Sequence, residues 1–568
     1  MATLEVVLDK MEKGNSIFEK EVRDLKTPAC KLFIKAGKIA PVTFKPQAKA
    51  ISTKDSAKVA KTFAQTVKAS GNKILIGSKS TSAKAVTGKR IAVLFSGGPA
   101  AGGHNVVAGI FDVLGSKNTL LGVKAGPKGL LQGDLFKITA ADVKRIKNTG
   151  GFDFLGSDRT KIKKEEQFKA VKKTCVDNKL DAIIVIGGDD SNTNAAVLAE
   201  YLFKNVKPDG SGVQVLGVPK TIDGDLQIGE LLPISFGFDT ATKIYGELVG
   251  NILQDTPSSR KYWHFVKLMG RSASHVTLEV ALQTKPAFTV VSEEVTEQKM
   301  SLGQIVDNIA QVVVKRAKGG INHGVVLIPE GLIEFVPEMT SLITELNEKV
   351  AAFEKILDAK NIAEKKDFIY SKLTPENAKL MASLPDYIEE MLLAERDSHG
   401  NLQVSLIPTE KLLIDMVKTR VKELAPEVKF KTHNHFFGYE GRCGAPTLFD
   451  AAYTYNLGMI AGSLALAGKT GYMASFTDLD KGGKVLAIPL TGLLNVEVRH
   501  GKEEMVIEKA LVRTDSPAFR FFEAHRKRWS SEDKFASPGP RQLWGPAAGQ
   551  IPITIALNQG YKTLAFKV

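Results

Sequence analysis

The chain has 568 residues, of which 43% are hydrophobic and 24% charged, a composition that excludes a wholly disordered or collagen-like protein. Its formal net charge is +15, but residues 1–90 hold 19 Lys and Arg against 7 Asp and Glu. The remaining body is therefore nearly neutral, and we expect no nucleic-acid partner. A solvated basic face is the simplest interpretation of residues 1–90, and attraction of anionic substrates or of a partner is the alternative.

Cysteine usage and hydropathy indicate the cellular compartment. The three cysteines, Cys30, Cys175 and Cys443, are far apart and form no CxxC pair, so we expect neither a disulfide framework nor a zinc site. No apolar run approaches the roughly 18–20 residues that span a bilayer, and the first residues lack the apolar core of a secretory signal. We therefore expect a cytoplasmic protein with no membrane partner.

In chain order, the predicted elements indicate an α/β fold. A helix is predicted over residues 55–70, followed by a short apolar stretch at 74–76. From residue 90 onwards, apolar runs alternate with polar or Gly-rich turns and helices, a pattern typical of buried parallel strands. Strands are predicted at 91–95, 182–186, 214–218, 263–268 and 325–328, and helices over 106–114 and from about 193. Such an alternation predicts doubly wound parallel sheets, in which ligands bind beyond the carboxyl ends of strands.

These elements suggest five segments. The first is a basic N-terminal extension (1–89), and the second is an α/β domain (90–255) that is rejoined by about 436–475. A second α/β domain (256–334) precedes a helical insertion (335–430), in which Glu, Lys, Leu and Ala recur at helical spacing. The last segment (476–568) mixes short strands with Gly/Pro turns, and we expect it to be irregular.

The first loop that suggests chemistry is SGGPAAGG at residues 96–103. A Gly-rich turn between a strand and a helix lets backbone N–H groups approach a phosphate. The loop matches neither the dinucleotide-binding motif nor the P-loop. A tight turn without a ligand is an equally compatible interpretation.

The second loop is GGDDSNTNAA at residues 187–196, where Asp189 and Asp190 follow two glycines at a strand end. A helix cap is the alternative function for such residues, but a cap needs only one of them. Adjacent carboxylates at a helix start also suit a hydrated Mg²⁺ that bridges to phosphate oxygens. We favour the metal-binding interpretation.

The third loop is PKTIDGDL at residues 219–226, which contains Lys220, Asp223 and Asp225. A plain Asp-Gly turn is the alternative. One carboxylate could accept the proton of a hydroxyl nucleophile, the other could steer the metal, and the lysine could stabilise a transferring phosphate. Together the three loops predict phosphoryl transfer.

With these residues in place, the chain resembles the phosphofructokinase family over about residues 90–475, most closely its pyrophosphate-dependent members of the long type. Seven motifs in order carry the resemblance: SGG at 96–98, GGDDSNT at 187–193, PKTIDGD at 219–225, KYW at 261–263, MGR at 269–271, PEG at 329–331 and GYEGR at 438–442. The resemblance implies two Rossmann-like doubly wound parallel-sheet domains. It also implies a Mg²⁺-dependent, reversible and direct in-line transfer from pyrophosphate to O1 of fructose 6-phosphate, a reaction of glycolysis and gluconeogenesis.

The resemblance implies roles for individual residues. Gly97 and Gly98 would approach pyrophosphate through backbone N–H groups, Asp189 would hold Mg²⁺, and Asp223 would be the general base. The other catalytic residues would be Lys220, Asp190, Asp225 and Arg271. The residues implied to contact fructose 6-phosphate are Thr221, Ile222, Asp223, Lys261, Tyr262, Met269, Gly270, Arg271, Glu330, Tyr439, Glu440, Gly441 and Arg442.

The resemblance also implies a homodimer or a higher homo-oligomer, because Lys261 and Tyr262 would reach into a neighbouring subunit's site. Either Lys431 or His433 would take the place of a second arginine that the neighbour contributes in the family.

Two positions bear on the phosphoryl donor. ATP-using relatives typically carry Gly in place of Asp190 and of Lys220. The Asp190 carboxylate adds bulk and negative charge where a nucleotide's α-phosphate would lie, and Lys220 adds a cation suited to pyrophosphate. Pyrophosphate is therefore the expected donor. The alternatives are an ATP-dependent 6-phosphofructokinase and a non-catalytic regulatory subunit of a heteromeric complex.

Overall fold

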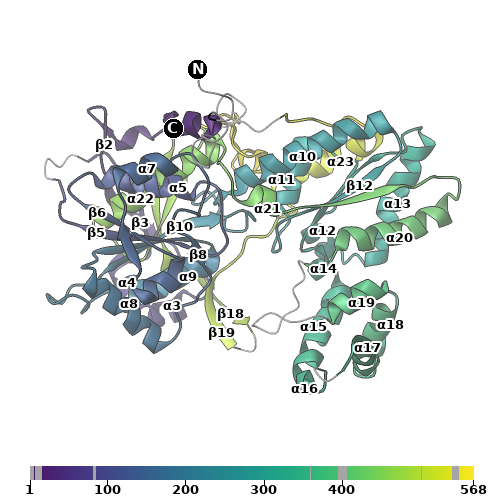
Figure 1. Ribbon diagram of the computed structural model, residues 1–568, viewed down its shortest axis with the longest axis horizontal. Helices are drawn as coiled ribbons and strands as arrows, with labels where there is room; N and C mark the ends of the chain where they lie inside the picture. Colours follow the sequence, from purple (N-terminus) through teal and green to yellow (C-terminus); the bar gives the residue numbers. More distant parts are fainter. Residues whose placement is uncertain are drawn as a thin grey trace. The chain divides into compact units, whose positions relative to one another are not determined.

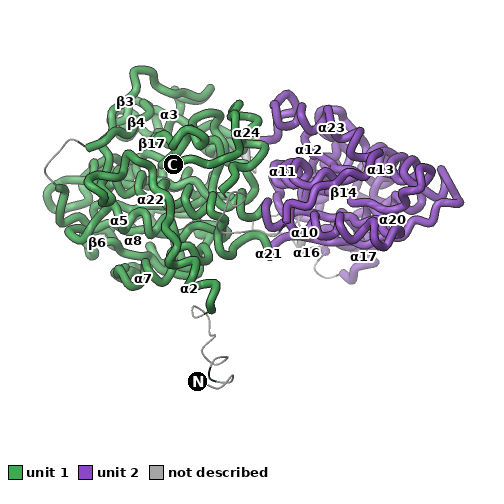
Figure 2. Tube along the Cα trace, turned by 90° about the horizontal axis from the view of Figure 1, so that it is seen from above, with its two compact units in different colours: residues 1–241, 440–510, 541–568 green, residues 242–439, 511–540 purple. Residues whose placement is uncertain are grey.

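A computed structural model of the chain describes residue 6 and residues 16–80, 85–357, 360–393, 406–499, 502–539 and 549–568. The chain divides into two compact units, which Figure 2 shows in different colours. Unit 1 comprises Met1–Ala241, Glu440–Ala510 and Arg541–Val568, and unit 2 comprises Thr242–Tyr439 and Leu511–Pro540. The boundary between them falls inside helix α10 (Phe238–Ser259).

Unit 1 is built around a sheet of eleven described strands with a parallel centre in the order β16-β10-β9-β5-β6. Antiparallel strands β17, β4 and β3 extend one edge, and β7 extends the other. The strands are β3 (Thr43–Ala50), β4 (Lys73–Ser78), β5 (Arg90–Ser96), β6 (Thr119–Val123), β7 (Leu135–Lys137), β8 (Ser157–Asp158), β9 (Ala182–Gly187), β10 (Gln214–Thr221), β11 (Phe236–Gly237), β16 (Tyr472–Thr477) and β17 (Lys484–Pro489).

Helices cover both faces of this sheet, as expected for a doubly wound fold. Figure 1 shows α5, α7 and α22 on one side and α3, α4, α8 and α9 on the other. These seven helices and three others of unit 1 are α2 (Ile17–Asp24), α3 (Ser56–Thr62), α4 (Ala64–Ser70), α5 (Gly103–Leu114), α6 (Gly126–Gln132), α7 (Ala140–Ile146), α8 (Glu165–Asp177), α9 (Asp189–Tyr201), α22 (Leu448–Leu466) and α24 (Ile553–Asn558). Every residue of β9 is buried, which explains its unbroken apolar run.

The predicted N-terminal extension contributes two strands to the unit 1 sheet. Strand β4 pairs with β17, with Leu75 opposite Ala487, and β3 pairs with β4. Ile74 and Leu75 are each 3% exposed. Burial of these two apolar side chains stabilises the pairing of β4 with the sheet, because removing apolar surface from water is favourable.

Residues 476–568, expected to be irregular, contain regular elements. Besides β17, they form the hairpin β18 (Leu494–Arg499) and β19 (Lys502–Ile507) and the helix α23 (Pro517–Glu532). The Ser516 hydroxyl caps α23 by accepting a hydrogen bond from the Phe519 N–H, and Pro517 is the first helical residue. Serine followed by proline is a sequence signal for a helix start.

Unit 2 contains a fully parallel sheet in the order β13-β14-β12-β15. Its strands are β12 (Trp263–Leu268), β13 (Phe288–Thr289), β14 (Gly324–Pro329) and β15 (Thr432–Phe437). Its shorter connecting helices are α11 (His275–Thr284) and α12 (Ser292–Glu297), and α13 (Leu302–Lys318) follows them. The parallel sheet of unit 2 and the mixed sheet of unit 1, with its parallel centre, confirm the predicted α/β fold class.

The helical insertion is also present in unit 2. Its helices are α14 (Leu332–Phe335), α15 (Pro337–Ala352), α16 (Glu354–Leu357), α17 (Ile362–Tyr370), α18 (Pro375–Ala382), α19 (Asp386–Leu392) and α20 (Thr409–Leu424). One buried apolar cluster runs from Trp263 of the sheet to Leu346, Leu392 and Val421 of these helices. The insertion is therefore part of the unit 2 core. None of the described helices is long and apolar enough to cross a membrane.

Candidate active site

Three of the predicted loops meet at one edge of the unit 1 sheet. They follow β5, β9 and β10, which are adjacent and parallel, so that their carboxyl ends lie together. The predicted residues that the structure brings to this edge are Gly97, Gly98, Asp189, Asp190, Lys220, Thr221, Ile222, Asp223 and Asp225.

The turn after β5 is shaped by two glycines that lie against cationic side chains. Gly97 has a φ of +85°, in the left-handed region that favours glycine. A Cβ atom on Gly98 would lie 2.1 Å from Nη2 of Arg442, and one on Gly97 would lie 3.4 Å from Nζ of Lys220. The absence of side chains thus lets the turn approach both cations. A glycine turn beside an ammonium and a guanidinium is suited to binding phosphate.

The backbone of Gly97 itself is engaged within the protein. Its N–H donates to the carbonyl of Asp158 at 2.9 Å, and its carbonyl accepts from Oγ of Ser157 at 2.5 Å. Both partners belong to β8, which pairs with the end of β5. The Gly97 N–H thus has a protein partner in this conformation, and its contact with pyrophosphate stays a prediction. The Lys220 and Arg442 side chains, which lie beside the turn, are the cationic groups here that could bind an anion.

Lys220 is a buried cation at the end of β10. Only 6% of the residue is exposed, and its ammonium lies 5.8 Å from the centre of the Phe152 ring. Burial lowers the pKa of Lys220 to about 8, an effect that the Asp223 carboxylate opposes and that repulsion from Arg442 increases. A bound anion would offset both the burial and the repulsion.

Asp189 and Asp190 form the first turn of α9 rather than its cap. The N-cap is Gly188, and α9 begins at Asp189, four residues before the expected start near residue 193. Carboxylates in a first helical turn are stabilised by the helix dipole, which favours the earlier start. The side chains of Asp189 and Asp190 therefore do not cap α9.

The environment of Asp189 combines burial with several charges. Burial raises the pKa of Asp189, Lys509 lowers it, and the neighbouring Asp190 and Asp225 raise it further. Asp225 is buried, and its Oδ2 lies 3.8 Å from Nζ of Lys509. The buried Asp225 and the half-buried Asp189 thus both lie near one lysine that no sequence motif indicated.

These carboxylates fit a particular kind of metal site. Among the described residues, no group of three or more His, Cys, Asp or Glu side chains could enclose a metal ion. Mg²⁺, however, keeps several waters and is usually held by one or two carboxylates together with substrate phosphates. Asp189, with Asp225 nearby, offers such a partial set of ligands.

Asp190 points to a different partner. Its Oδ1 lies 3.0 Å from Nζ of Lys161, and both side chains are exposed enough to contact solvent. The carboxylate is therefore held at the site by an ion pair with a residue that sequence reasoning missed. Lys161 lies in the basic run RTKIKK at 159–164, the only sequence signal that could have indicated it.

Asp223 lies in the turn that follows β10. Its N–H donates to Oγ1 of Thr221 at 3.1 Å, and Oγ of Ser235 donates to the Thr221 carbonyl at 3.2 Å. Ile222 is buried, whereas Asp223 is partly exposed. The Asp223 carboxylate lies near enough to Lys220 to raise the pKa of the lysine. A carboxylate in a fixed turn, beside a cation and open to solvent, is suited to act as a general base.

The buried carboxyl group of Asp450 is hydrogen-bonded to the backbone next to this turn. Strand β11 pairs with the end of β10, with Gly237 opposite Thr221. Asp450 accepts hydrogen bonds from the Gly237 N–H at 3.1 Å and from the Thr240 N–H and Oγ1 at 2.9 and 2.6 Å. Burial, and then the nearby Asp239, raises the pKa of Asp450 to about 7. The Asp450 side chain thus fixes the backbone on which Lys220 and Asp223 depend.

Another predicted group gathers within unit 2, beyond the ends of β12 and β14. The Gly270 N–H donates to Oε2 of Glu330 at 2.9 Å, and the Met269 N–H donates to the Phe437 carbonyl at 3.0 Å. A Cβ atom on Gly331 would lie 2.0 Å from the carbonyl oxygen of Arg271, so the two motifs are in close contact. Glu330 is buried and Arg271 is exposed.

Lys261 and Tyr262 lie at the other end of β12. The Lys261 ammonium is 5.2 Å from the centre of the Tyr262 ring, which lies 4.5 Å from the centre of the His433 ring. The Lys431 carbonyl accepts a hydrogen bond from the Trp263 N–H at 2.9 Å. Met269 and Lys261 therefore mark opposite ends of one strand.

The GYEGR motif is divided between the units. Tyr439, which is 72% exposed, belongs to unit 2, whereas Glu440, Gly441 and Arg442 belong to unit 1. All four form the short helix α21 (Tyr439–Arg442). The resemblance implied a sugar-phosphate contact for Arg442, and within unit 1 this side chain lies against Gly98.

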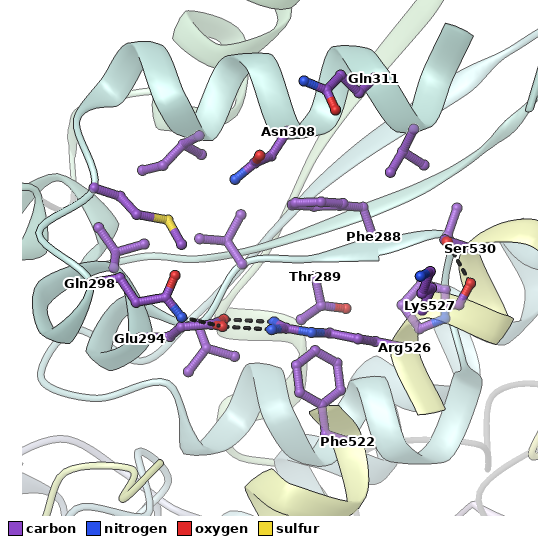
Figure 3. A pocket seen from close by; sticks show the side chains of 18 of the residues that line it. Phe288, Thr289, Glu294, Gln298, Asn308, Gln311, Phe522, Arg526, Lys527 and Ser530 are labelled. Atoms are coloured by element: carbon purple, nitrogen blue, oxygen red, sulfur yellow. Dashed lines mark hydrogen bonds and ion pairs between the residues drawn. The ribbon is translucent and has the colours of Figure 1, made fainter. Parts of the chain in front are cut away.

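Unit 2 also contains a cavity of about 580 Å³ between β13, α12, α13 and α23. Figure 3 shows Arg526 reaching Glu294, with which it forms two hydrogen bonds of 2.7 and 2.6 Å, near Phe288 and Phe522. None of the predicted site residues lines this cavity. The chemistry indicated by the motifs therefore lies elsewhere.

Comparison with known proteins gives consistent matches. The sequence profile described as Phosphofructokinase matches residues 90–465. The chain is 48% identical over 470 residues to pyrophosphate–fructose 6-phosphate 1-phosphotransferase of Porphyromonas gingivalis, covering 80% of this chain and 84% of that protein. It is 47% identical over 482 residues to the beta subunit of this enzyme from Solanum tuberosum, covering 83% and 82%.

A solved structure is similar in fold. The crystal structure of pyrophosphate-dependent phosphofructokinase from Nitrosospira multiformis matches with a TM-score of 0.51 at 16% identity, covering 84% of this chain and 98% of that one.

Proposed function

This chain belongs to the phosphofructokinase family, and on that basis we propose that it transfers a phosphoryl group from pyrophosphate to O1 of fructose 6-phosphate. The products are fructose 1,6-bisphosphate and phosphate. The observation that carries the proposal is the turn at Gly97 and Gly98, where Lys220 and Arg442 lie beside backbone that has no side chains. Similarity to relatives named for this activity supports the same assignment.

In the proposed mechanism, Asp223 accepts the proton of the O1 hydroxyl as that oxygen attacks phosphorus. Lys220 stabilises the negative charge on the transferring phosphoryl group, and Arg442 does the same from the Gly98 side. Phosphoryl transfer requires mainly positioning and charge stabilisation, so no covalent intermediate with the enzyme is needed. In the reverse direction, Asp223 returns the proton to O1.

Asp189 would hold Mg²⁺, with Asp225 close by. The ion would neutralise charge on the phosphate oxygens. The chain's own contribution is to hold a half-buried carboxylate at the start of α9 and a buried one after β10, and partial burial raises the pKa of Asp189. An ion held by so few protein ligands would bind more tightly in the presence of pyrophosphate than alone.

The residues proposed to bind fructose 6-phosphate are those of the MGR and PEG motifs in unit 2. Glu330 would accept hydrogen bonds from sugar hydroxyls, and it is oriented by the Gly270 N–H. Arg271 is exposed and supplies a guanidinium for a phosphate. Lys261 and Tyr262 would contact a neighbouring subunit's substrate, which would make the active enzyme a homo-oligomer.

The chain retains each group that the reaction needs. A regulatory subunit would tolerate loss of the base or the metal carboxylate, but Asp189, Lys220, Asp223 and Arg271 are all present. We therefore propose a catalytic chain. Phosphorus NMR of a mixture of the purified chain, Mg²⁺, fructose 6-phosphate and pyrophosphate tests this directly. Equal formation of phosphate and of a new phosphate ester on O1 supports the proposal, and unchanged pyrophosphate refutes it.

A further inference from the structure

The C-terminal hairpin of unit 1 returns to the carboxylates of the site. Within β19, the Ile507 N–H donates to Oγ1 of Thr193 in α9 at 3.1 Å. Three residues later, the Ala510 N–H donates to the Asp225 carbonyl at 2.7 Å. The backbone on both sides of Lys509 is thus attached to the two elements that carry Asp189 and Asp225.

Lys509 lies between these attachments and directs its ammonium toward the carboxylates. Its Nζ is 3.8 Å from Oδ2 of Asp225, within ion-pair range but longer than a hydrogen bond. It is the first among the charges that favour ionisation of Asp189. The Lys509 side chain is 37% exposed while that of Asp225 is 7% exposed. The ammonium therefore reaches the buried Asp225 carboxylate from the solvent side.

This arrangement places the ammonium where a second anion can approach it from solvent. A lysine head on a flexible four-carbon stem is a mobile point charge. The pair with Asp225 is longer than a hydrogen bond and the lysine side chain is partly exposed, so the pair with Asp225 contributes little binding energy. Pyrophosphate oxygens close to the carboxylates would offer a stronger, charge-assisted hydrogen bond.

We propose that Lys509 is a pyrophosphate-binding residue, which offsets the Asp189 and Asp225 charges in the free protein and contacts a pyrophosphate oxygen in the complex. The inference rests on the proposed function, because it names a further contact to the same donor. It makes the hairpin part of the substrate site. The residue lies 284 positions after Asp225 and outside the seven motifs.

The proposal predicts two effects of opposite direction when the charge is removed. Lys509 competes with a divalent cation for Asp225 and repels it, so Lys509→Gln should bind a divalent ion alone roughly threefold more tightly. The same variant should bind pyrophosphate roughly tenfold more weakly, because a charge-assisted hydrogen bond is lost. A purely structural role would weaken both.

The experiment measures binding rather than turnover, with the full chain. Free Mn²⁺ is followed by electron paramagnetic resonance in the absence of pyrophosphate, and pyrophosphate is titrated calorimetrically at saturating Mg²⁺. Lys509→Gln is compared with Lys509→Arg, which keeps the charge, and with Lys163→Ala. Lys163 pairs with Glu504 of the same hairpin at 2.9 Å, so its loss tests hairpin attachment without removing Lys509.

Tighter Mn²⁺ binding with weaker pyrophosphate binding in Lys509→Gln alone, and near-normal values in the other two variants, is the expected result. Unchanged pyrophosphate affinity in Lys509→Gln would overturn the proposal, and so would an equal loss in Lys163→Ala. These outcomes are separate from the proposed function. A chain that binds pyrophosphate through Lys509 but forms no fructose 1,6-bisphosphate would refute the reaction and leave the contact standing.

Discussion

The ammonium of Lys220 and the guanidinium of Arg442 lie beside consecutive glycines, Gly97 and Gly98, although the two cations are more than two hundred residues apart in the chain. Lys220 is buried, and Arg442 is close enough to contribute to lowering its pKa. Two cations at one turn repel each other until an anion lies between them or beside both. The free protein is therefore arranged for an anionic substrate.

This relationship predicts the effect of a side chain on the turn. In Gly98→Ala, the added Cβ would displace the Arg442 guanidinium, whose Nη2 lies 2.1 Å from its position. Because a flexible side-chain end can move, we expect normal folding with a raised KM for pyrophosphate, by roughly tenfold for one lost charged contact. Gly444→Ala is the matched control, since a Cβ there meets nothing within 4 Å. Equal kinetics in the two variants would argue against an anion-binding function of Arg442.

The depressed pKa of Lys220 predicts a pH dependence. The ammonium is charged below its pKa of about 8 and neutral above it, so kcat/KM for pyrophosphate should fall as pH rises through that value. Lys220→Arg keeps the charge at all these pH values and should lack this decline, even if its rate is lower throughout. A pH profile between 6 and 10 for both proteins gives the comparison. The same decline in both would assign it to another group.

Asp190 is predicted to exclude nucleotides. Its carboxylate is held at the site by Lys161, 3.0 Å away, and it would repel the α-phosphate of ATP. Asp190→Gly should gain weak ATP-dependent phosphorylation of fructose 6-phosphate while keeping activity with pyrophosphate. Lys161→Ala is the control, because it removes this ion pair but keeps the carboxylate. ATP use by Lys161→Ala but not by Asp190→Gly would show that the carboxylate is not the barrier.

Asp223 is predicted to be the general base. Asp223→Ser should lower turnover with pyrophosphate by roughly 10²–10⁴ in both directions, the range expected for loss of such a group. Binding of fructose 6-phosphate should change far less. Asp189→Ala, by contrast, should raise the Mg²⁺ concentration needed for half-maximal rate. Recovery of Asp223→Ser by excess Mg²⁺ would instead mark Asp223 as a metal ligand and shift the base to Asp225.

Most of the fold and the motif-bearing loops could be predicted because their signals are local. Buried parallel strands such as β9 appear as unbroken apolar runs, and glycines beside acidic residues mark strand ends. The place of β4 in the sheet could not be predicted, because its partner β17 lies about four hundred residues away. Pairing of this kind depends on tertiary burial rather than on local pattern.

The site contacts that the sequence did not predict also depend on segments that are distant in the chain. Lys509 reaches Asp225 only because β19 is attached to α9 through Thr193. The engagement of the Gly97 N–H depends on β8, a two-residue strand without a hydrophobic pattern. Such contacts are set by the packing of distant segments, which the spacing of motifs does not encode.

The central claim is that pyrophosphate, not ATP, is the phosphoryl donor to fructose 6-phosphate. One coupled assay of the purified chain, with Mg²⁺ and fructose 6-phosphate, compares the two donors by following fructose 1,6-bisphosphate. We expect rapid product formation with pyrophosphate, release of phosphate in equal amount, and little or no product with ATP. Robust product formation with ATP, or none with pyrophosphate, would contradict the proposed functions of Asp190 and Lys220 together.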